Sequence, residues 1–194
     1  MVDKLGKYPN LRYGGDAAKL RLAGTYVKTA DQRAVVDAVH RFWRALGATI
    51  GPAATPAADE FRAHGAFGTC ILPAGADADG DPWVGLYDSA RYDDHAWLDE
   101  RRQALAHYLG VPAWSFYLHP GKLASGESHY AGLARKSTTS WKSTVEAADR
   151  FPHPMHGYQP ADALAGVSWI AISCDRAAVL HQLEFDRSFW TRSA

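Results

Sequence analysis

The sequence predicts an α+β protein built on an antiparallel sheet with helices on one face. Between residues 18 and 119, segments with apolar residues at strand spacing and segments with apolar residues at helix spacing follow one another in the order β-α-β-β-α-β. This order is the split βαβ, or ferredoxin-like, arrangement. The composition, 47% hydrophobic and 22% charged, is that of a globular chain that can bury a core.

The first expected strand covers residues 20–28, and a helix follows it. Thr29 or Asp31 can cap this helix, and Gly47 can end it. Helical spacing is seen for the apolar side chains Val35, Val36, Val39, Phe42, Trp43 and Leu46.

Residues 50–64 are rich in Gly, Pro and Ala, which predicts a loop with a short helix around residues 57–62. Residues 67–73 and 83–87 are short β-type runs. The Gly/Asp-rich residues 74–82 separate them, as expected for two antiparallel strands joined by a turn.

A second helix is expected over residues 95–109, with Gly110 as its stop. Residues 113–118 then alternate as a strand and complete the unit of residues 18–119.

Residues 120–194 read as an α/β extension that shares the same core, so we expect residues 1–194 to form one domain. The extension contains the segment 126–134, a helix over residues 140–150 and a strand over residues 167–173. The Ser/Thr run before this helix is typical of a helix cap.

Charge and hydropathy exclude several classes of function. The formal net charge is zero, so the chain lacks the basic field that captures nucleic acid. No signal peptide is evident at the start, and no apolar run is long enough to span a bilayer. We therefore expect a cytoplasmic protein, in which Cys70 and Cys174 are small hydrophobic residues without a disulfide.

No cofactor motif is found. Residues 77–81 (Asp-Ala-Asp-Gly-Asp) resemble the start of a calcium loop, but the glycine is at the fourth position and the twelfth residue is Asp88 where the loop needs Glu. A polar turn is the better interpretation. Standard zinc spacings, a nucleophile elbow and a phosphate-binding glycine loop are also missing from the sequence. We expect no bound cofactor.

Charge placement is the most uneven feature. Residues 77–100 contain eight acidic residues and one arginine, with aromatic residues between them. Turns and the first turns of helices favour aspartate, so one interpretation is that these acidic residues form a solvent-exposed edge without a binding function. The other is a surface for a basic protein partner, with the candidate residues Asp77, Asp79, Asp81, Asp88, Tyr92, Asp93, Asp94 and Trp97.

The histidines of the second half offer an alternative. A small enzyme or ligand sensor could use them with Glu127 or Tyr130 for proton transfer or metal binding, because histidine titrates near neutral pH. The candidate pocket residues are His119, His129, His153 and His156. A subunit that pairs through an open sheet edge is a third possibility.

The segments Trp83-Val-Gly-Leu-Tyr-Asp-Ser-Ala-Arg-Tyr92 and Trp114-Ser-Phe-Tyr117 give the chain a layout that resembles small bacterial immunity proteins of polymorphic or contact-delivered toxin systems. The resemblance implies a cytosolic protein that neutralises a toxin or enzyme by binding it, without turnover. It assigns no functional residue, partner or oligomeric state.

Overall fold

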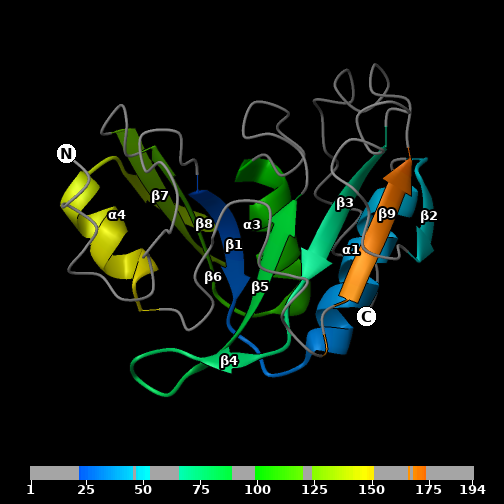
Figure 1. Ribbon diagram of the computed structural model, residues 1–194, viewed down its shortest axis with the longest axis horizontal. Helices are drawn as coiled ribbons and strands as arrows, with labels where there is room; N and C mark the ends of the chain where they lie inside the picture. Colours follow the sequence, from blue (N-terminus) through cyan, green and yellow to red (C-terminus); the bar gives the residue numbers. More distant parts are fainter. Residues whose placement is uncertain are drawn as a thin grey trace.

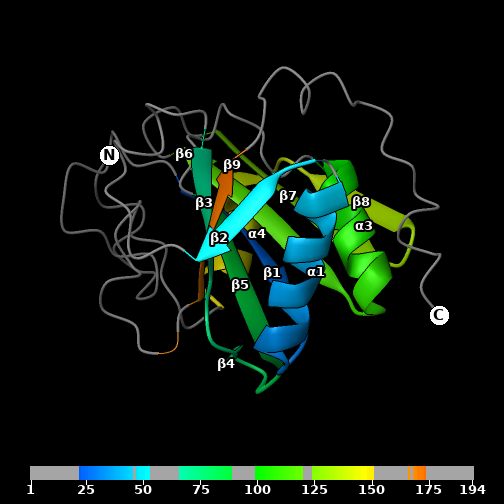
Figure 2. The same cartoon turned by 90° about the vertical axis from the view of Figure 1, so that its right-hand side faces the viewer.

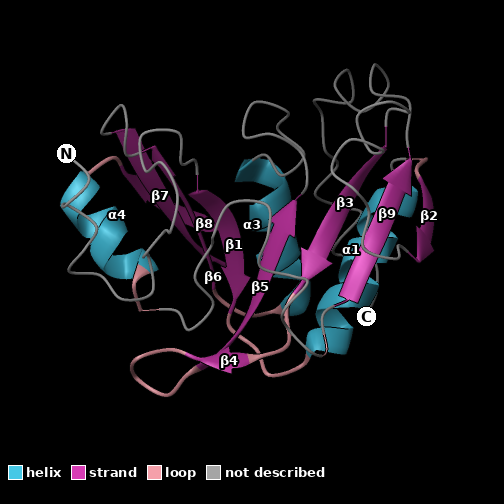
Figure 3. Cartoon of the chain, in the orientation of Figure 1, coloured by secondary structure: helices cyan, strands magenta, loops and turns pink. Residues whose placement is uncertain are grey.

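The computed structural model has an α+β fold and describes residues 22–45, 47–52, 66–88, 99–119, 124–150, 166 and 168–173. Its strands are β1 (Leu22–Val27), β2 (Thr49–Pro52), β3 (Ala66–Ile71), β4 (Gly75–Ala76), β5 (Pro82–Asp88), β6 (Ala113–His119), β7 (Ala124–Ala131), β8 (Ala134–Thr138) and β9 (Ser168–Ser173). The described helices are α1 (Gln32–Ala45), α3 (Asp99–Leu109) and α4 (Trp141–Ala148), as Figure 3 shows.

One sheet joins strands from the whole described chain. Its order is β2-β9-β3-β5-β1-β6-β7-β8, and β4 pairs with β5 beside this path. All of the strand pairs are antiparallel. β9 therefore lies between β2 and β3, two strands that come more than 90 residues before it in the sequence (Figure 1).

Helices α1 and α3 lie together on one side of the sheet (Figure 2). Successive side chains of a strand point to opposite faces, so the register decides which residues these helices cover. Val27 is paired with Val84 and with Ala113, and all three belong to the core cluster that contains α1 and α3. The sequence prediction of a sheet with helices on one face holds for these two helices.

Local signals fix the ends of α1. The Asp31 carboxylate accepts a hydrogen bond from the Ala34 amide at 2.9 Å, so Asp31 is the residue that caps the helix. At the other end, the Gly47 amide donates to the Arg44 carbonyl and the Ala48 amide to the Trp43 carbonyl. This closing turn needs a positive φ, which is 79° at Gly47.

Helix α4 covers the opposite face of the sheet at β6 and β7. The side chain of Ser143 in α4 contacts Glu127 of β7, which is on the face away from Tyr130 and the α1–α3 core. Ser140 caps α4 by accepting a hydrogen bond from the Ser143 amide, as the Ser/Thr run predicted. On this same face, the buried rings of Tyr26, Trp114 and Phe116 stack on one another.

Several strands were not predicted from the sequence, among them β2 and β8. The expected loop over residues 50–64 is wrong at its start, because Thr49–Pro52 forms β2 against β9. The Ser/Thr run that was expected to be only a helix cap begins inside β8 (Ala134–Thr138), which pairs with β7 across a two-residue turn. The short helix expected at residues 57–62 is not among the described residues. In the described part of the chain, no helix is long and apolar enough to cross a membrane.

Candidate functional site

The first candidate site is the acidic turn of residues 77–81, which links β4 to β5. It extends beyond the lower end of the sheet in Figure 1. The Asp77 amide donates to the Asp81 carbonyl at 2.9 Å, and the Gly80 amide donates to the Asp77 carbonyl at 3.0 Å. Gly80 has a φ of 85°, a conformation that glycine adopts without strain. The prediction of a polar turn is confirmed.

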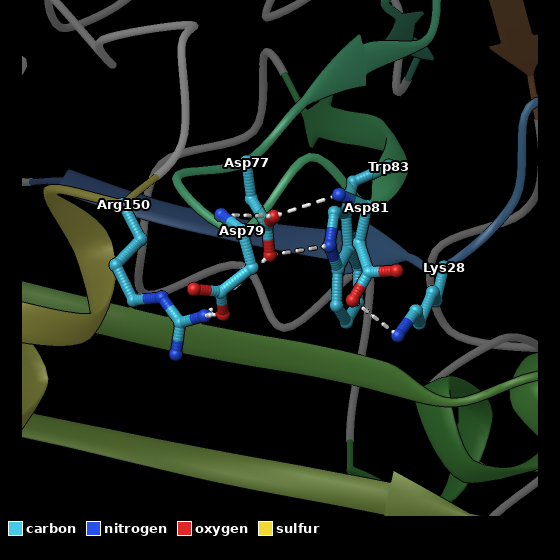
Figure 4. A network of polar contacts seen from close by, with 6 residues as sticks. All are labelled: Lys28, Asp77, Asp79, Asp81, Trp83 and Arg150. Carbon is cyan, nitrogen blue, oxygen red and sulfur yellow. Dashed lines mark hydrogen bonds and ion pairs between the residues drawn. The ribbon is translucent and has the colours of Figure 1, made fainter.

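Asp77 faces into the turn. Its side chain is 4% exposed. Oδ1 accepts hydrogen bonds from the amides of Asp79 and Asp81 at 2.9 and 3.0 Å, and Oδ2 accepts one from Trp83 Nε1 at 3.0 Å. Figure 4 shows the carboxylate at the centre of these contacts. Asp77 therefore organises the turn from within.

The surroundings of Asp77 favour its charged form. Burial by itself raises the pKa of this carboxyl group. The amides of Asp81 and Asp79, the Trp83 indole and the charge of Arg150 outweigh burial and hold the pKa below its ordinary value.

Asp79 and Asp81 are at the surface and pair with cations from distant elements. Arg150, just after α4, forms an ion pair with Asp79 and lies 3.7 Å from Asp77 Oδ2. Lys28, just after β1, lies 2.5 Å from Asp81 Oδ2. Figure 4 shows the two cations on opposite sides of the turn. Much of the acidic charge predicted here is therefore balanced within the chain.

The other predicted residues of the acidic surface are less defined. Asp88 is the last residue of β5, with its backbone paired with Thr69. Tyr92, Asp93, Asp94 and Trp97 are not among the described residues.

The second candidate site surrounds Glu127 on the face that α4 covers. The Glu127 side chain is 3% exposed. Ser143 Oγ donates to Oε1 at 2.6 Å, and Trp114 Nε1 donates to Oε2 at 2.9 Å. His129 Nε2 lies 3.5 Å from Oε2, and the His129 side chain is 56% exposed. The arrangement places a buried carboxylate beside one nitrogen of a solvent-accessible imidazole.

The predicted histidine pocket is brought together only in part. His119 ends β6 five positions beyond Trp114, the residue opposite His129, which is about 17 Å along the strand. Tyr130 is buried on the other face, where its hydroxyl lies 3.2 Å from Ser115 Oγ. His153 and His156 are beyond the described ranges. Of the described candidates, Glu127 and His129 form a pair.

Sequence reasoning named Glu127 as a partner for the histidines, but it missed Arg150 at the acidic turn and Ser143 at Glu127. Glu127 and His129 are two positions apart on a strand, and this spacing could have placed them on one face. No local signal links Arg150 to Asp79 or Ser143 to Glu127, because each contact joins elements far apart in the sequence.

Comparison with protein families, curated proteins and solved structures finds no match to this chain. Within the described ranges, no group of three or more His, Cys, Asp or Glu side chains could hold a metal ion.

Proposed function

We propose that this protein is a cytosolic binding protein that neutralises a toxin or enzyme partner, as immunity proteins do, through an acidic surface centred on the turn of residues 77–81. The observation that carries the proposal is the internal organisation of this turn by Asp77, with Asp79 67% exposed at its tip. A turn that is already ordered loses less conformational entropy when a partner binds, which favours affinity.

The ion pairs of Asp79 and Asp81 are compatible with this function. Both pairs are partly exposed, and pairs of this kind contribute about 0–1 kcal/mol to stability. The two aspartates attract a basic partner toward the turn as it approaches. The partner can then replace Arg150 and Lys28 at a small cost in free energy, because the ion pairs that it breaks are weak. Asp88, Tyr92, Asp93, Asp94 and Trp97 complete the proposed surface.

Retention of a partner tests the proposal. Native mass spectrometry of the protein purified from a lysate of its own host is expected to show a stoichiometric complex with a basic protein. The double variant Asp79→Asn/Asp81→Asn is expected to retain less of this complex than the wild type does. Glu146→Gln, which removes an exposed charge from α4, is the matched control and is expected to keep it. Equal complex in all three proteins would remove the turn from the proposed surface.

A second function is favoured by the Glu127–His129 pair. A buried carboxylate beside an accessible imidazole is a common arrangement for proton transfer or ligand binding. We propose as the alternative a small enzyme or ligand sensor that uses His129. A small molecule or metal bound to the wild type, and lost from His129→Ala, would support it. Unchanged mass and metal content in the two proteins would dispose of it.

We also propose that the unit of residues 18–119 is ferredoxin-like. The order β3-β5-β1-β6 within the longer sheet supports this assignment. In the ferredoxin-like arrangement the strand that is third in the sequence, here β5, lies in the sheet between the first and second strands, here β1 and β3. An experimental structure in which α1 and α3 did not share a face would contradict it.

A further inference from the structure

Strand β8 (Ala134–Thr138) is the last strand at one end of the sheet. Among the described strands it pairs with β7 alone, and four of its five residues are exposed. In an antiparallel pair, only alternate residues direct their N–H and C=O groups toward the neighbouring strand. The other residues of β8 direct theirs away from β7, so this edge has the geometry to accept a further strand.

Hydrogen bonds to other elements keep β8 in a fixed position. At the β7–β8 turn, the Gln103 side chain of α3 donates to the Leu133 carbonyl. Along the strand, the hydroxyl oxygens of Ser128 and Ser137 are 2.8 Å apart, and Arg135 Nε donates to Ser137 Oγ at 2.9 Å. An edge that is already ordered loses little conformational entropy when a strand is added to it, which favours binding.

The exposed formal charges of the β7–β8 hairpin are positive. Arg135 and Lys136 of β8 are exposed, whereas the acidic residue of the hairpin, Glu127, has a side chain that is 3% exposed. Consecutive residues of a strand point to opposite faces of the sheet, so the two cations flank the edge on both faces. The residues of an added strand that lie directly opposite them would have their Cβ atoms about 5 Å away.

We propose that the β8 edge binds an extended, acidic segment of a partner protein, which adds to the sheet as a further strand. Two consecutive acidic residues of that segment face Arg135 and Lys136. A second copy of the chain is disfavoured, because full antiparallel overlap of two β8 strands places Lys136 opposite the same lysine of the other copy. At the far end of the sheet, β2 contains Pro52, which has no N–H to offer a further strand. The proposal does not depend on the acidic turn of residues 77–81.

A short peptide tests the proposal. The probe is Thr-Val-Glu-Glu-Val-Thr with blocked ends, and its control has lysine in place of both glutamates. An NMR titration of the whole chain at low ionic strength is expected to shift the β8 amide signals with the acidic peptide and to leave them unmoved with the lysine peptide. The acidic peptide methylated at every amide nitrogen is expected not to bind, because it has no N–H to pair with the edge.

Charge reversal on β8 gives the second test. Arg135→Glu/Lys136→Glu is expected to bind the acidic peptide about tenfold more weakly, because like charges then lie opposite each other. The same variant is expected to bind the lysine peptide, a gain that misfolding could not produce. Arg33→Glu/Arg44→Glu, at two exposed positions of α1, is the matched control and is expected to keep the wild-type affinity.

Four results would overturn the proposal. They are no binding of the acidic peptide to the wild type, signal shifts confined to residues outside β8, equal affinity for the methylated peptide, and equal affinity of the wild type and the β8 double variant.

Discussion

The indole Nε1 of Trp83 lies 3.0 Å from Oδ2 of Asp77, so one carboxylate both closes the acidic turn and fixes the first residues of the strand that follows it. The other oxygen of the same carboxylate accepts the amides of Asp79 and Asp81. Asp77 faces into the turn, whereas Asp79 and Asp81 face outward. Substitutions of the inward and the outward aspartates are therefore expected to change stability by different amounts.

Asp77→Ala is expected to lower the free energy of unfolding by about 1–3 kcal/mol, because it leaves two amides and an indole without their acceptor. Asp79→Ala is expected to cost less than about 1 kcal/mol, because it removes a partly exposed ion pair. Urea unfolding of the two variants measures both values. Equal losses would show that Asp77 does not organise the turn.

The depressed pKa of Asp77 predicts an acid dependence of stability. The folded state binds its proton less readily than the unfolded state, whose aspartates titrate near about 3.9. Its contribution is therefore present above that pH and lost as the pH falls through the folded pKa. Asp77→Asn is expected to flatten the fall of stability between pH 5 and 3. Asp37→Asn, an exposed position on α1, is the control and is expected to keep the wild-type slope.

His40 on α1 binds its proton differently in the folded and the unfolded state. Burial, followed by the nearby Arg44 charge, lowers the pKa of His40, and Asp37 offsets this only in part. The folded state binds the His40 proton less readily than the unfolded state does, so its contribution to stability falls as the pH drops through the unfolded value of about 6.5. His40→Gln is expected to reduce the loss of stability between pH 7 and 5. An unchanged slope in thermal unfolding would contradict this.

Gly126 is held by a close approach. A Cβ at this position would lie 2.4 Å from Tyr117 Cε1, a ring atom of the residue opposite it on β6. Gly126→Ala is expected to cost about 1–3 kcal/mol from overpacking. Adding Tyr117→Leu is expected to recover part of that loss in a double-mutant cycle. Gly51→Ala is the control, since nothing lies within 4 Å of its added Cβ.

The sequence predicted those features that local patterns determine. The helical spacing of Val35 to Trp43 and the stops at Gly47 and Gly110 placed α1 and the end of α3, and the Gly/Asp composition of residues 74–82 placed the turn. β2 has Gly and Pro in half of its positions, and β8 carries polar, exposed side chains, so neither has the apolar alternation that marks a strand.

The candidate sites depend on contacts that no local pattern encodes. The run of aspartates identified the acidic turn, but the partners that balance it come from positions after β1 and after α4. A count of charges along the chain therefore overstated the net charge of the turn of residues 77–81. The strand spacing of Glu127 and His129 was visible in the sequence, whereas the α4 residue that completes the cluster was not.

The association rate of the complex tests the central claim most directly. The rate constant for binding of the co-purified basic partner should be measured at low and at physiological ionic strength, for the wild type, Asp79→Asn/Asp81→Asn and the control Glu146→Gln. The account predicts that the double variant associates about three- to tenfold more slowly at low salt and that the difference shrinks as salt screens the charges. Equal rates for the wild type and the double variant at low salt would contradict the claim that the acidic turn recognises the partner.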